Sequence, residues 1–191
     1  MKRHRFAGTL MPLALLLCAG AAHAVADEVQ RMSDDVYQTS VAFCSGVISA
    51  ERLMCQGDMI AAGSRVVASL GGLPPTSAAA IGEAARSKLP APERKELGPV
   101  IAGPINKDDD LAGLAGMIRL CDVYKPEPAS HARHHAMLKQ QAPDAASQVE
   151  ALLADSSVVA RQRVSVGVWK ILAVQGPDSA GSACTQLDGA P

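Results

Sequence analysis

The sequence predicts an all-α fold, a compact bundle of five to seven helices stapled by disulfides. Three observations favour this class. The 191 residues are 48% hydrophobic but only 3% aromatic, and helix formers outnumber the β-branched and aromatic residues that favour strands. Apolar residues recur at steps of three, four and seven, as on one face of a helix. Glycines and prolines separate these periodic stretches.

The first 24 residues have the pattern of a secretory signal peptide. Three of the first five are basic, an apolar run follows from Leu10 to Ala22, and a small residue, Ala24, ends the segment. This order is typical of export signals, and the run is shorter than the roughly 20 residues that cross a bilayer. We expect cleavage after Ala24. The mature chain, 25–191, would then be one helical domain, periplasmic or secreted, without a membrane span.

Charge and aromatic content argue against nucleic acid as a partner. The chain has 18 Lys and Arg residues against 19 Asp and Glu residues. The signal segment removes three basic residues and no acidic ones, so the mature chain is mildly acidic and repels phosphate backbones. Its aromatic side chains, Tyr37, Phe43, Tyr124 and Trp169, are too few and too scattered to form a base-stacking platform.

A long first helix is predicted over residues 34–70, because apolar positions from Tyr37 to Leu70 follow helical spacing. Ser33 is placed to cap it, and two aspartates in the first turn suit the positive end of the helix dipole. Glycines and prolines directly after Leu70 end the helix. Gly46 and Gly57 are the two positions at which it would break.

The mature chain keeps four cysteines: Cys44, Cys55, Cys121 and Cys184. An even number in an oxidising compartment indicates two disulfides, and no two cysteines have the close spacing of a zinc site. On an unbroken helix, Cys44 and Cys55 would lie roughly 16 Å apart, beyond the about 7 Å that a disulfide spans. We therefore expect two long-range bridges, either Cys44–Cys184 with Cys55–Cys121 or Cys44–Cys121 with Cys55–Cys184.

Turn residues divide the next part of the chain into shorter helices. Capping residues and apolar spacing predict helices at about 76–88, 92–97, 108–121, 130–140 and 144–153. The caps are Thr76 or Ser77 for the first of these, Ser130 for the fourth and Asp144 for the fifth. Asp108–Asp110 are interpreted as a helix start rather than a calcium site. Proline and glycine predict loops at 98–107 and 125–129.

Residues 158–174 fit two patterns. Alternating valines favour a strand, whereas Val164, Val168 and Leu172 share a helical face, and Gly176 followed by Pro177 is a helix stop. We favour a helix, because a strand here would have no partner elsewhere in the sequence. The polar tail, 178–191, would fray on its own, and we expect Cys184 to tether it.

The histidines His131, His134 and His135 are the strongest candidates for a binding site. On a helix these positions share one face, so His131 with either neighbour suits zinc, copper or nickel. A third ligand would come from Glu127 or from an acid on another helix. The alternative interpretation is a solvated polar face beside basic neighbours.

No catalytic or cofactor-binding motif occurs in the sequence. It lacks the nucleophile elbow, the P-loop, the dinucleotide fingerprint and the H-E-x-x-H zinc motif, so it does not indicate an enzyme, nor a cofactor beyond a transition metal at the histidines. The leading hypothesis is macromolecular binding, as an inhibitor, accessory or envelope-assembly factor whose partner is another cell-envelope protein. The alternative hypothesis is a metal-binding protein that uses His131, His134 and His135.

Overall fold

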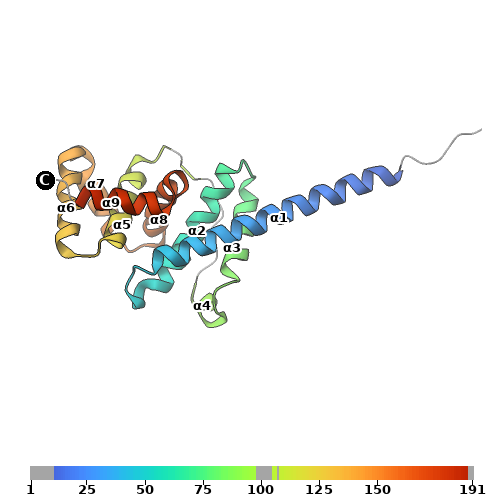
Figure 1. Cartoon of the computed structure of the whole chain (residues 1–191), viewed down its shortest axis with the longest axis horizontal. Helices are drawn as coiled ribbons and strands as arrows, with labels where there is room; N and C mark the ends of the chain where they lie inside the picture. The colour runs from blue at the N-terminus through green and yellow to red at the C-terminus, as the bar shows by residue number, and fades with distance from the viewer. Residues whose placement is uncertain (1–10, 98–104, 107, 189–191) are drawn as a thin grey trace, which may run out of the picture.

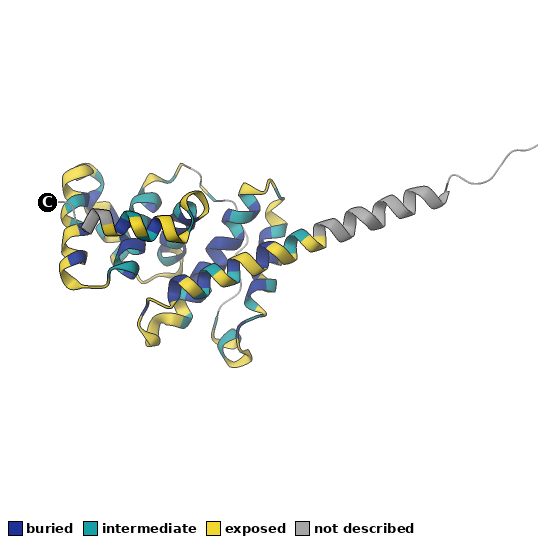
Figure 2. Cartoon of the chain, in the orientation of Figure 1, coloured by how far each residue is buried: buried dark blue, intermediate teal, exposed yellow. Residues whose placement is uncertain are grey.

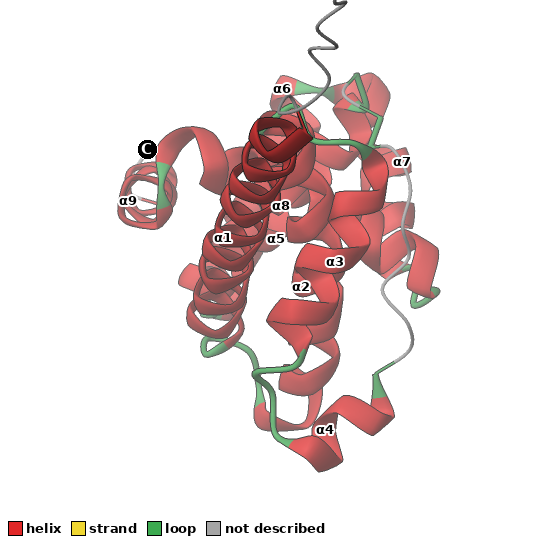
Figure 3. Ribbon diagram, turned by 90° about the vertical axis from the view of Figure 1, so that its right-hand side faces the viewer, coloured by secondary structure: helices red, strands yellow, loops and turns green. Residues whose placement is uncertain are grey.

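The computed structural model confirms an all-α fold (Figures 1 and 3). It describes the backbone of residues 11–97, 105–106 and 108–188, with side chains from Ala26 to Thr185. Over these ranges there are nine helices and no strand. The helices are α1 Met11–Cys44, α2 Ser49–Leu70, α3 Pro75–Arg86, α4 Ala91–Glu96, α5 Asp110–Tyr124, α6 Pro128–Gln141, α7 Pro143–Ala154, α8 Val158–Gln175 and α9 Pro177–Asp188.

Two of the sequence predictions concern residues that the structure describes only in part. The export signal, 1–24, falls in the segment whose side chains lie outside the described residues, and it stays a prediction. Most of the predicted loop 98–107 also lies outside them. Among the described helices, none combines the length and the apolar character that a membrane span requires.

Helix α8 lies at the centre of the fold. It packs against both α2 and α5, while α1 and α3 cover α2, and α6 and α7 lie against α5. Burial follows this arrangement, because α2 is buried over seven consecutive residues, 58–64, and α8 is buried at most positions from 160 to 169 (Figure 2). The predicted helix over 158–174 is confirmed, and Ser157 caps it by accepting a hydrogen bond from Ala160 N.

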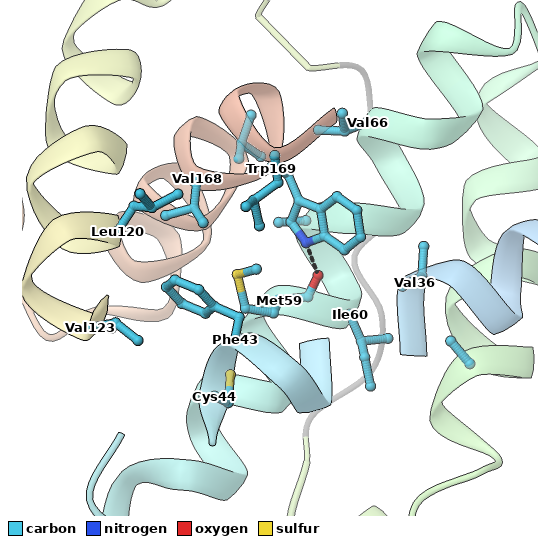
Figure 4. Close-up of a cluster of buried hydrophobic side chains, with 14 of the residues drawn as sticks. Val36, Phe43, Cys44, Met59, Ile60, Val66, Leu120, Val123, Val168 and Trp169 are labelled. Atoms are coloured by element: carbon cyan, nitrogen blue, oxygen red, sulfur yellow. Dashed lines mark hydrogen bonds between the residues drawn. The ribbon is translucent and has the colours of Figure 1, made fainter. Parts of the chain in front are cut away.

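The main core forms around Trp169 (Figure 4). Its indole N–H donates to the carbonyl oxygen of Met59 at 2.7 Å, and the ring lies against Gly63, where a Cβ atom would collide with the indole. Phe43 and Val168 complete the apolar surroundings. The ring therefore fixes α8 against α2 through both packing and a satisfied buried N–H.

The single helix predicted over 34–70 is wrong, because the chain turns between Cys44 and Ser49. The turn lies against α5, and a Cβ on Gly46 would come within 2.9 Å of Val123 Cγ1 and of the Val123 carbonyl oxygen. The helix therefore breaks at Gly46, one of the two glycines at which a break was expected. Ser33 is not a cap either: it is buried inside α1, and its hydroxyl donates to the carbonyl oxygen of Gln30.

Both predicted long-range disulfide pairings are wrong. The bridges are Cys44–Cys55 and Cys121–Cys184, with Cα atoms 5.8 and 5.2 Å apart. The turn at Gly46 folds α2 back along α1, so Cys44 and Cys55 meet. Loop-closure entropy assigns about 3 kcal/mol to the bridge with a separation of 11 residues and about 4 kcal/mol to the one with a separation of 63.

The C-terminal tail is tethered through Cys184, as predicted, by the Cys121–Cys184 bridge. It forms α9, in which Ala180 and Cys184 are buried against the main core. The helix count therefore exceeds seven for two reasons: the predicted first helix is two helices, and the tail is a ninth.

Proline, rather than the predicted side-chain caps, opens several helices. Helices α3, α6 and α7 begin at Pro75, Pro128 and Pro143, where proline's fixed φ angle suits the first turn and its missing N–H leaves no donor unpaired. Ser130 is instead buried within the first turn of α6.

The start of α5 confirms the helix-start interpretation of Asp108–Asp110. Asp109 accepts a hydrogen bond from Ala112 N at 3.0 Å and binds the Arg163 guanidinium through both carboxylate oxygens, at 2.6 and 2.7 Å. The hydrogen bond from Arg163 is the main cause that lowers the pKa of Asp109 below its ordinary value. This pair joins the start of α5 to α8.

Further along, α5 and α8 touch through glycine backbones. A Cβ on Gly116 would collide with the backbone of Gly167 and Val168. We predict that Gly116→Ala lowers the free energy of unfolding by about 1–3 kcal/mol, as overpacked sites do. Gly113 on the same helix has open space around it, so Gly113→Ala is expected to stabilise by about 0.5–1 kcal/mol. Urea unfolding of both variants checks this, and equal effects would contradict the close approach.

The Asp109–Arg163 pair predicts a pH-dependent contribution to stability. Asn still caps a helix, so Asp109→Asn isolates the ion pair and should cost about 1 kcal/mol at pH 7. Because the folded-state pKa of Asp109 is lowered, this contribution is present above about pH 4 and is lost as the pH falls further. Unfolding of both proteins at pH 7, 5 and 3 tests this. If the unfolding free energy of the wild-type protein exceeded that of Asp109→Asn by more at pH 3 than at pH 7, the prediction would be contradicted.

Candidate metal centre

The three histidines lie on α6 in two different environments. His131 and His135 are one turn apart on one face, with ring centroids 4.3 Å apart, whereas His134 is buried with a relative exposure of 1%. His134 is therefore not part of a solvated polar face, which was the alternative interpretation of the histidines. His131 is exposed and His135 is half-buried, so two rings remain within reach of a ligand.

Asp122 of α5 joins these histidines from a second helix. Its Oδ2 atom lies 2.9 Å from His131 Nδ1 and its Oδ1 atom 3.0 Å from His134 Nδ1. The carboxylate thus accepts from one exposed and one buried imidazole. Asp122 directly follows Cys121, whose disulfide to Cys184 is buried in the core. The backbone that carries the carboxylate is therefore held in place by the core.

Asp122, His131 and His135 form a group suited to a metal ion. One ligand atom from each lies within 4.8 Å of the other two, and two imidazoles with a carboxylate are ligands that transition metals accept. The Nε2 atom of His135 is buried and has no hydrogen-bond partner in the part of the chain that the structure describes. A buried ring nitrogen in this state is costly, and coordination of a cation is one way in which an imidazole nitrogen is satisfied.

Glu150 of α7 lies at the edge of this group. Its Oε1 atom is 3.7 Å from His135 Nδ1 and 3.1 Å from Lys139 Nζ. The hydrogen bond from Lys139 holds the pKa of Glu150 below its ordinary value, so this carboxyl group is ionised at neutral pH. It adds a negative charge next to the three candidate ligands.

The candidate ligands border a pocket of about 570 Å³. The pocket reaches from α6 and α7 across α8 to α2, where Asp58 binds Arg161 Nε at 2.7 Å. Burial raises the pKa of Asp58, although the hydrogen bond from Arg161 opposes that shift. The apolar part of the lining comprises Phe43, Met54, Met59, Leu152, Leu153, Val164 and Val168.

The structure thus brings together two of the three predicted histidines and places the third behind them. The third candidate ligand is an acid on another helix, Asp122, rather than Glu127, which is exposed at the start of α6. Sequence reasoning missed Asp122 and Glu150, because no spacing rule connects them to the histidines. The four cysteines whose side chains the structure describes contribute no free thiol, since all are bridged.

Comparisons with protein-family models, with curated proteins and with solved structures found no match to this chain.

The contrast between His134 and His131 gives a stability prediction. His134→Ala removes a buried side chain and leaves an oxygen of Asp122 without its donor, so we expect a loss of about 1–3 kcal/mol in unfolding free energy. His131→Ala acts on an exposed ring and should change stability by less than about 0.5 kcal/mol. Thermal and urea unfolding of both variants measure this. A larger loss for His131→Ala than for His134→Ala would contradict the assigned environments.

Proposed function

We propose that this protein binds a divalent transition-metal ion, zinc or copper(II), through Asp122, His131 and His135. The observation that carries this proposal is the group of three ligand atoms within 4.8 Å of one another. Two imidazoles and one carboxylate match the ligands of these ions. Asp122 comes from α5, and His131 and His135 come from α6. The three side chains therefore lie close together only when these two helices are packed in the folded protein.

A hydrogen bond from His134 to Asp122 supports the same proposal. His134 donates to Asp122 from the buried side, and an outer hydrogen bond of this kind orients a ligating carboxylate. We assign His134 this positioning role, although the sequence favoured it as a ligand.

The basic neighbours of the histidines, Arg133 and Lys139, would repel a cation, but both contact other side chains. Lys139 binds Glu150, and Arg133 donates to the Ser130 hydroxyl. Asp122 contacts His131 directly, and Glu150, which pairs with Lys139, lies 3.7 Å from His135. These carboxylates favour a divalent cation.

The proposed location is the periplasm or the extracellular space. The export signal predicted from the sequence supports it, and two disulfides are typical of proteins in an oxidising compartment. In such a compartment the four cysteines would be bridged, so the histidines and carboxylates rather than thiolates would take the metal.

Binding to another envelope protein is the second candidate function. Ile48, Met54, Val158 and Val159 are large apolar side chains with relative exposures between 47 and 75%, and such side chains favour contact with a partner. Single exposed apolar residues are common on monomers, however, so the grouped ligand atoms make metal binding the stronger candidate.

Metal titration tests the proposed function. We expect the chelator-treated protein to take up one equivalent of zinc or copper(II) in competition with a chromophoric indicator. His131→Gln, His135→Gln and Asp122→Asn should each weaken binding by at least about tenfold, because each removes one of three ligands.

The matched control is Glu127→Gln, which removes an exposed acid from the start of the same helix and should leave the affinity unchanged. Far-ultraviolet circular dichroism shows whether each variant is folded. Uptake by a folded His131→Gln, His135→Gln double variant with wild-type affinity would mean that the metal binds elsewhere, and the proposal would be rejected.

A further inference from the structure

The candidate metal centre opens into the 570 Å³ pocket, because Asp122, His131 and His135 all belong to its lining. Three protein ligands leave at least one position of a four-coordinate ion free, which is the arrangement of metal sites that bind exchangeable ligands. The pocket volume is within the range of about 300–1,000 Å³ that small-molecule sites occupy. A molecule in this pocket could therefore reach the metal directly.

Arg119 is the second feature of this pocket. It lies one helical turn before Asp122 on α5, so both side chains are on the same side of the helix, and both line the pocket. Arg119 is half-buried, and it makes no ion pair or hydrogen bond with any described residue. The other arginine of the lining, Arg161, is already bound to Asp58. Arg119 is thus a guanidinium available to an anionic ligand.

The charge of the pocket depends on the metal. Acidic residues of the lining outnumber its arginines; they are Glu51, Asp58, Asp122, Glu150 and Asp155, against Arg119 and Arg161. Without a metal this surplus repels anions. A bound divalent cation becomes the largest local charge, and together with Arg119 it makes this end of the pocket favourable for one negative group.

The apolar lining determines which chemical group of a bound ligand would lie beyond its negative group. Phe43 and Met59 extend the pocket into the main core, and Leu152 and Leu153 line it from α7. Met54 lies at a more exposed position, with 49% relative exposure. Burial of an apolar chain against such a surface is favourable, because it removes apolar surface from water. The occupant therefore combines a single negative group with an apolar body.

We propose that the metal-loaded pocket binds a small monocarboxylate with an apolar chain. The carboxylate occupies the free position of the metal and pairs with Arg119, and the chain lies against the apolar lining. This inference rests on the proposed metal binding and adds to it the chemical class of the ligand. It assigns Arg119, to which no sequence motif pointed, to ligand binding.

Octanoate is a suitable probe for this proposal. The full mature protein is first titrated with zinc against an indicator, and octanoate is then titrated calorimetrically into the zinc-loaded and the metal-free protein. We expect octanoate to bind the zinc-loaded protein at least about tenfold more tightly. Arg119→Gln should weaken octanoate binding by about 10- to 100-fold while zinc affinity stays unchanged, and Arg119→Lys should restore part of it.

Matched ligands and a matched variant complete the experiment. Octanamide has the chain without the charge, and acetate has the charge without the chain, so each should bind at least about tenfold more weakly than octanoate. Lys95→Gln removes an exposed positive charge of α4, outside the pocket, and should change neither affinity.

The possible results separate the two proposals. Zinc uptake without octanoate binding overturns the ligand proposal alone, and absence of zinc uptake overturns both. Equal octanoate binding to the zinc-loaded protein, the metal-free protein and Arg119→Gln would show a purely apolar pocket and would also overturn it. Inorganic phosphate binding as tightly as octanoate would assign the site to a different anion and reject the carboxylate.

Discussion

Trp169 lies with its indole ring directly over Gly63, and the ring N–H is bonded to the carbonyl oxygen of Met59. This contact sets the distance between α8 and α2, and the other helices are arranged around that pair. α5 approaches the opposite side of α8 until the backbones of Gly116 and Gly167 meet. With so few aromatic residues in the chain, close contact through glycine and alanine replaces the bulk that larger side chains provide in other cores.

The candidate metal centre depends on this arrangement although none of its ligands belongs to α8. Asp122 is carried by α5, whose position is fixed by the glycine contact with α8 and by the adjacent Cys121–Cys184 bridge. His131 and His135 lie on α6, which follows α5 after a short turn and packs against it. The core therefore holds the helices that carry the candidate ligands. Ligands on such helices have a better defined geometry than ligands on a flexible surface segment.

The sequence was informative where local chemistry decides the structure. The helix over 158–174 and the helix start at Asp108–Asp110 follow from spacing and from the capping capacity of aspartate side chains. It was misleading where tertiary contacts decide, as at Gly46, where helical spacing continues across a turn that α5 requires. That error produced the wrong disulfide pairings. The partnership of Asp122 with the histidines was hidden for a related reason, since it depends on how α6 returns along α5.

The order of the two disulfides along the chain has a consequence for oxidation. Four cysteines can pair as separate, interleaved or nested loops, and here the first pairs with the second and the third with the fourth. In a chain that enters an oxidising compartment from its N-terminus, Cys44 meets its correct partner before either later cysteine arrives. The two rings then close independently, and neither has to open for the other to form. This topology suits a protein that matures without disulfide isomerisation.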